Sequence, residues 1–211
     1  MHPAAAPAAV ALLLAEQLGD HPVDVLLEGR LEEVRARFPG DEARVARMSI
    51  IEDGQTVYRA TPEEMVAGCR KAKEAGFELS VYVLLGLGGE HLSAAHARDT
   101  AAVLNRIDPH FIRVRTLQPQ PGSGLYDDMA AGAFVKASHE TVLREQRIMV
   151  ENLDVTSEYL SDHITNYIPV NGRLPGDREA MLRAIDEHSA ALMHNAALHD
   201  RFARKDGLTS L

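Results

Sequence analysis

The sequence predicts an α/β protein built around a parallel sheet, and three observations support that class. Short apolar runs of strand length alternate with segments of helical periodicity through about residue 117. Several of these runs lack regularly spaced polar positions, which is typical of strands covered on both faces by crossover helices. No internal repeat or low-complexity linker interrupts the 211 residues, so residues 1–211 are expected to form a single domain.

Four elements are expected before residue 60. In chain order they are a helix, a strand, a helix and a strand, over residues 8–18, 22–28, 31–38 and 45–51. Pro39-Gly40 stops the second helix, since these residues break regular structure. Glu52-Asp53-Gly54 ends the second strand, and Asp and Gly both suit a turn.

The strongest helix start in the chain is Thr61-Pro62-Glu63-Glu64. Thr61 suits the N-cap, Pro62 suits the first helical position, and Glu64 completes a capping box. Gly76 is the expected end of this helix. The run 77–85 then predicts a third strand, which contains Val-Tyr-Val-Leu-Leu and is too apolar to leave one face in water.

The glycine-rich loop 86–90 leads into an expected helix over 93–107 with a cap near Ser93. A fourth strand follows over 111–117, and Arg113 and Arg115 share one of its faces because side chains alternate along a strand. Three later segments are expected: a helix over 138–152, a mixed polar stretch over 155–167 that crosses the open end of the sheet, and a final helix over 177–199.

Composition narrows the classes of partner. The net charge of −9 argues against nucleic acid or an anionic membrane as a partner recognised through the overall field. No apolar stretch approaches the roughly 20 residues of a membrane span, and the apolar run 8–15 lacks the basic residues of a secretory signal. A cytoplasmic protein is expected.

Cysteine content limits the chemistry most. Cys69 is the single cysteine, so the chain can form neither an internal disulfide nor a cysteine-held cluster or zinc site. Its helical setting predicts a plain buried thiol. His96 and Asp99 have the spacing of a helical metal pair, but two ligands do not make a site, and no metal site is predicted.

Candidate ligand contacts lie in loops that follow strands, because α/β proteins bind ligands at the carboxyl ends of parallel strands. Gly86, Gly88 and Gly89 would let the backbone approach a ligand, and a tight turn is the alternative interpretation. Glu52, Glu90 and Arg115 could recognise a zwitterionic ligand, and an internal ion-pair network is the alternative.

His163 forms a second candidate cluster with three polar neighbours. Asp162, Asn166 and Tyr167 lie close to it in sequence, and the group could face a substrate. A hydrogen-bonded loop or helix cap is the alternative interpretation.

Four segments in order carry a resemblance to radical S-adenosylmethionine (radical SAM) proteins, in the branch of oxygen-independent coproporphyrinogen oxidase and the Elongator catalytic subunit. In chain order they are Ile51-Glu52-Asp53-Gly54, Phe77 to Glu90, Ile107 to Tyr126, and Ser161 to Asp177. The resemblance implies a partial (βα) TIM-type barrel with parallel strands over 22–126 and a helical C-terminal extension over 127–200. It also implies that Glu52, Gly86, Gly88, Gly89 and Glu90 bind S-adenosyl-L-methionine (SAM), and that Arg115 and His163 take catalytic roles.

The sequence departs from this family at the cluster. The family's CxxxCxxC loop is absent, as are the strand before it and the next helix–strand unit, so this chain alone cannot bind the expected [4Fe–4S] cluster. We therefore expect a truncated or divergent radical SAM protein whose intact form would cleave SAM reductively at such a cluster and act on an unknown small-molecule substrate.

Two alternatives remain open at this point. One is a non-catalytic half-barrel scaffold that binds a partner chain or self-associates through an exposed sheet edge. The other is a nucleotide- or phosphate-binding protein that uses the loop at Gly86.

Overall fold

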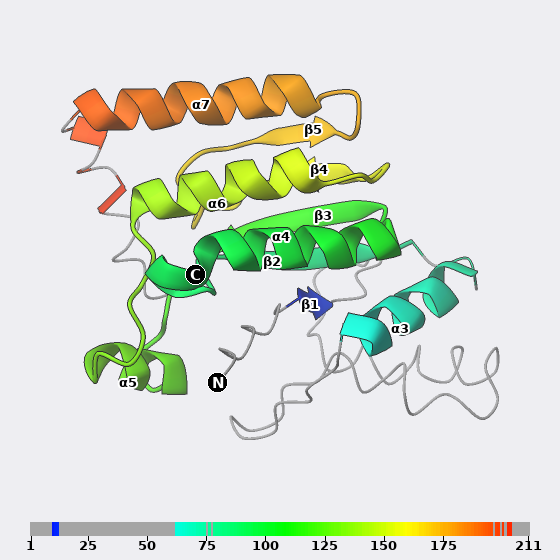
Figure 1. The fold of residues 1–211 in the computed structure, drawn as a ribbon, viewed down its shortest axis with the longest axis horizontal. Coiled ribbons are helices and arrows are strands. Elements are labelled where there is room, and N and C mark those ends of the chain that lie inside the picture. Colours follow the sequence, from blue (N-terminus) through cyan, green and yellow to red (C-terminus); the bar gives the residue numbers. More distant parts are fainter. Residues whose placement is uncertain are drawn as a thin grey trace.

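The computed structural model describes residues 62–74, 76, 78–195, 197–198, 200 and 202–203, together with the backbone of residues 10–12. Within them a mixed α/β arrangement has five helices around one sheet (Figure 1). The helices are α3 Pro62–Glu74, α4 Gly89–Ile107, α5 Gly124–Ala130, α6 His139–Asn152 and α7 Arg178–His194. The strands expected over 22–28 and 45–51 and the helix over 31–38 lie outside the described residues.

The sheet has the strand order β1-β2-β3-β4-β5. Its strands are β1 Val10–Leu12, β2 Ser80–Leu85, β3 Phe111–Thr116, β4 Glu158–Leu160 and β5 Asn171–Arg173. The central strands β2, β3 and β4 pair in parallel, and the outer strands β1 and β5 pair antiparallel to their neighbours. The parallel α/β class is confirmed in this part, while closure toward a TIM-type barrel stays a prediction.

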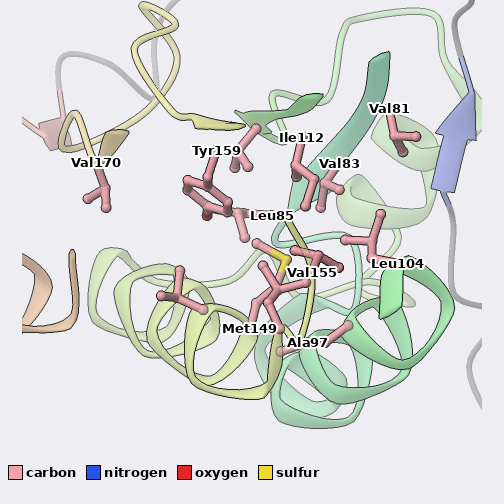
Figure 2. Packing of buried hydrophobic residues seen from close by; sticks show 14 of the residues in the cluster. Val81, Val83, Leu85, Ala97, Leu104, Ile112, Met149, Val155, Tyr159 and Val170 are labelled. Carbon is pink, nitrogen blue, oxygen red and sulfur yellow. The ribbon is translucent and has the colours of Figure 1, made fainter. Parts of the chain in front are cut away.

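Helices α4 and α6 cover one face of the sheet (Figure 1). Alternate residues of β2 and β3 point into this layer, and Val81, Val83, Ile112 and Val114 are almost fully buried there. Figure 2 shows these strands meeting residues of the two helices, with Tyr159 of β4 in the same cluster. The apolar positions of the strands and helices therefore build the core between the sheet and the α4–α6 layer.

The opposite face of β2 and β3 is only partly covered. Tyr82 and Leu84 lie in register with Arg113 and Arg115, and all four are half-buried. The expected pairing of the two arginines on one face is confirmed. The expectation that β2 has no partly exposed face is wrong, because Tyr82 and Leu84 are half-buried beside the arginines of β3.

Capping and stop residues in the sequence correctly predicted the start of α6 and the end of α3. Ser138 caps α6 by accepting a hydrogen bond from the Thr141 backbone N–H, as expected from the sequence. The helix expected from Thr61 ends before Gly76, which has a positive φ of 84°. Thr61 itself lies outside the described residues.

Other boundaries depend on tertiary contacts and differ from expectation. Residues 10–12 form strand β1 along β2 instead of part of a helix over 8–18. Helix α4 begins at Gly89, with Ser93 inside it and buried, because the Ser93 hydroxyl bonds a side chain of α6 instead of the backbone. The stretch 155–167 contains strand β4, and helix α5 was not expected.

No helix in the described part of the chain is long and apolar enough to cross a membrane.

Candidate functional site at the strand carboxyl ends

The carboxyl ends of β2 and β3 bring an arginine and an aromatic ring together. Arg115 is next to last in β3, and its guanidinium carbon lies 4.9 Å from the centroid of the Tyr82 ring. Such a cation–π contact orients a guanidinium without neutralising it. Among the described residues no carboxylate forms an ion pair with Arg115.

The segment 161–167, which follows β4, is tied to the end of β3. The Thr116 backbone N–H donates to the Thr165 hydroxyl at 3.3 Å, and the Thr116 hydroxyl donates to the side-chain oxygen Oδ1 of Asn166 at 3.1 Å. The Asn166 amide donates in turn to the Val114 carbonyl at 2.8 Å. Asn166 and Thr116 are buried, so these bonds fix the segment beside the strand end.

His163 lies on this segment and close enough to Arg115 to be affected by its charge. The Thr165 backbone N–H donates to Nδ1 of His163 at 3.3 Å, and the Thr165 hydroxyl lies 2.8 Å from the same atom. Nδ1 is therefore an acceptor, and the neutral ring carries its hydrogen on Nε2. Burial lowers the pKa of His163, the charge of Arg115 lowers it further, and Asp162 opposes both. The neutral ring would act as a hydrogen-bond donor through Nε2.

Titration of His163 tests whether this residue lies close to Arg115 and Asp162. We expect a midpoint below the ordinary 6.5, raised by Arg115→Gln and lowered further by Asp162→Asn. Because the folded chain binds this proton less readily than the unfolded chain, the stability contributed by neutral His163 declines as the pH falls from 6.5 through the lowered pKa. Histidine NMR resonances followed against pH measure it, and a midpoint unmoved by Arg115→Gln would contradict the grouping.

The glycine loop after β2 is a tight turn packed against other parts of the chain. Gly86 has a φ of +83°, and its carbonyl accepts the Gly89 N–H at 3.0 Å. Gly89 has a φ of +59°, and a Cβ there would lie 2.7 Å from the Val135 carbonyl oxygen. Gly88 caps the start of α4. Contacts within the chain therefore account for Gly86 and Gly89 without a ligand.

Glu90 is engaged with the start of α6. Its carboxylate accepts hydrogen bonds from the Ser138 backbone N–H and the Thr141 hydroxyl, both at 2.7 Å. These two bonds lower the pKa of Glu90, against a smaller opposing effect of burial. In this structure Glu90 completes the cap of α6, as a carboxylate at a helix N-terminus does. Glu52, the other acidic candidate, lies outside the described residues.

This cap predicts a pH-dependent contribution to stability. We expect Glu90→Gln to lower the free energy of unfolding by about 1 kcal/mol near neutral pH. Since the folded pKa is depressed, the difference from the natural chain is full above the ordinary pKa of 4.5 and disappears as the pH falls through the folded value. Urea unfolding at several pH values measures it, and a difference independent of pH would contradict the assignment.

A buried polar cluster that was not predicted from the sequence lies directly behind the turn. Glu145 of α6 contacts Gly86 and two residues of α4, Ser93 and His96. Glu145 lies between Val142 and Met149 on the buried face of α6, and a charged residue within that apolar stripe is the signal that could have revealed it.

The residues present do not fit an iron–sulfur cluster. Cys69 is 1% exposed within α3, and burial raises the pKa of its thiol to about 11. A thiolate ligand requires the opposite environment. In the described part of the chain, no three His, Cys, Asp or Glu side chains gather to hold a metal ion. The expected buried, plain thiol is confirmed at Cys69.

Alkylation kinetics test the state of this thiol. The pKa of about 11, against an ordinary 9.0, by itself reduces the thiolate fraction about 100-fold. We therefore expect iodoacetamide at pH 8 to modify the folded chain at least about 100-fold more slowly than the chain in urea. Comparable rates in the two states would contradict the burial.

The fold and the site define an α/β protein with parallel strands and polar side chains at the strand carboxyl ends. The chain is similar to a biotin synthase, a radical SAM enzyme, from Pseudarthrobacter chlorophenolicus. The two are 37% identical over 100 residues, which are 43% of this chain and 28% of that protein, so the chain spans less than a third of its relative. No protein-family profile matches the chain, and neither does a solved structure. The comparison supports a relationship to radical SAM enzymes, and the particular branch stays a prediction.

Proposed function

We propose that this chain is the ligand-binding segment of a radical SAM protein, and that the carboxyl ends of β2 and β3 bind SAM. The main support for this proposal is the environment of Arg115. Its guanidinium is held over Tyr82 beside a largely neutral His163, and no described carboxylate pairs with it. The similarity to a biotin synthase supports the class of ligand.

The chemistry of SAM suits these groups. Its methionine end carries a carboxylate, which a guanidinium can bind through two parallel hydrogen bonds. Glu52 would pair with the amino group, in the role that the resemblance implies. His163 would donate a hydrogen bond through Nε2 to SAM or to the small-molecule substrate. This chain by itself would bind SAM without cleaving it, because its single cysteine is a buried thiol.

Calorimetric titration of the 211-residue chain with SAM tests the proposal. We expect saturable binding of one SAM molecule per chain. A circular dichroism spectrum of the same sample should show that the protein is folded. ATP serves as the control ligand. Binding of ATP without binding of SAM would favour a phosphate site at the Gly86 turn instead, and a folded chain that binds neither would contradict both readings.

A non-catalytic scaffold is the second candidate, and one observation favours it. Gly86, Gly89 and Glu90 are all engaged in contacts within the chain, so much of the expected SAM loop has an internal role. A scaffold would stay folded and bind no SAM. Its self-association would use the sheet edge, where the described outer strands β1 and β5 have three residues each.

A further inference from the structure

Glu145 is a carboxylate in the middle of the packed layer between α6, α4 and the end of β2. Its side chain is fully buried, and three polar groups lie within hydrogen-bond distance of its carboxylate. The Gly86 backbone N–H lies 3.0 Å from Oε1, Nδ1 of His96 lies 2.9 Å from the same oxygen, and the Ser93 hydroxyl lies 2.5 Å from Oε2. The Gly86 bond spans 59 positions of sequence.

Each of the three partners carries a group that can donate a hydrogen bond to a carboxylate oxygen: the Gly86 backbone N–H, the Ser93 hydroxyl and a ring nitrogen of His96. Nε2 of His96 is buried and has no hydrogen-bond partner among the described residues. The Glu145 carboxylate therefore joins the end of β2 to two residues of α4 inside a buried layer.

Burying a carboxylate is costly, and an apolar side chain at this position of α6 would avoid the cost. What a carboxylate adds is directional contact with a backbone N–H at the point where β2 ends and the turn begins. We infer that Glu145 is a positioning residue, which holds the Gly86–Gly89 turn and the start of α4 in a fixed place at the carboxyl end of β2. The consequence for SAM rests on the proposed function, whereas the consequence for the turn does not.

The far end of the same helix pair offers a matched control. The Asn105 amide of α4 donates to the Asn152 carbonyl at the end of α6 at 2.9 Å, and the Asp154 backbone N–H donates to Asn105 at 2.7 Å. This contact also joins α4 to α6 through hydrogen bonds. It lies at the opposite end of the strands, so it cannot position the turn.

Amide hydrogen exchange of the full chain tests the positioning role. In Glu145→Ala we expect the amides of the Gly86–Gly89 turn to exchange about tenfold faster or more, relative to the Val83 and Val114 amides of the core. Glu145→Gln keeps an acceptor oxygen, so a smaller acceleration is expected, and it serves if the alanine variant does not fold. Asn105→Ala should leave the turn amides unchanged.

SAM affinity provides the second readout. We expect Glu145→Gln to weaken SAM binding about fivefold to tenfold, with no change in Asn105→Ala. Unchanged exchange at the turn in both Glu145 variants would overturn the inference, and so would equal acceleration in Asn105→Ala. If the natural chain binds no SAM, the proposed function is wrong, and the exchange rates still decide whether Glu145 positions the turn.

Discussion

Glu145→Ala is expected to lower the free energy of unfolding by about 3 to 5 kcal/mol, because several buried hydrogen bonds are lost together. The substitution leaves the Gly86 N–H, the Ser93 hydroxyl and Nδ1 of His96 without their acceptor in a fully buried space. Each unsatisfied buried group carries a desolvation penalty, and a cavity adds to it. Equilibrium unfolding in urea measures the loss.

Glu151 is the control on the same helix. Its carboxylate pairs with Arg147 at 3.1 Å on the exposed side of α6, so Glu151→Ala should cost less than about 1 kcal/mol. A cost for Glu145→Ala as small as that of Glu151→Ala would show that the buried contacts contribute little.

Arg115→Gln is expected to weaken SAM binding about 30-fold to 100-fold and to leave the stability of the chain almost unchanged. Loss of a charge-assisted contact with a carboxylate has this magnitude. Arg115→Lys keeps the charge but not the two parallel donors, and its affinity should lie between those of the natural chain and the glutamine variant. Calorimetric titration of the three proteins measures the series.

Arg113→Gln is the matched control, because Arg113 lies on the same face of β3 two positions earlier and donates to the Ser80 hydroxyl at 3.1 Å. It should retain SAM affinity. Equal losses in the two glutamine variants would point to a general effect of the positive face rather than a site at the strand end.

The elements that could be predicted are those marked by apolar runs and by turn or capping residues in their own sequence. Strands β2 and β3 are continuous runs bounded by turn residues, and α6 follows its own capping residue, Ser138. Strands β1, β4 and β5 have three residues each and no periodicity of their own. β1 and β4 each pair with a longer strand, and β5 pairs with β4, so all three depend on the tertiary arrangement.

The candidate site likewise has one feature that local sequence predicted and others that depend on tertiary contacts. Alternation along β3 predicted that Arg115 shares a face with Arg113, but its approach to His163 depends on the bonds from Thr116 to Thr165 and Asn166, about 50 positions away in sequence. Glu145 was missed because a glutamate in a helix is usually in water. Only the packing of α6 against the turn shows that this one is buried.

An NMR titration of the isotope-labelled 211-residue chain with SAM shows directly whether SAM binds at the strand carboxyl ends. We expect saturable chemical-shift changes at the carboxyl ends of β2 and β3 and in segment 161–167, including Gly86, Thr116 and Thr165. A folded spectrum without shifts, or shifts confined to the opposite ends of the strands near Asp108 and Thr156, would contradict this expectation.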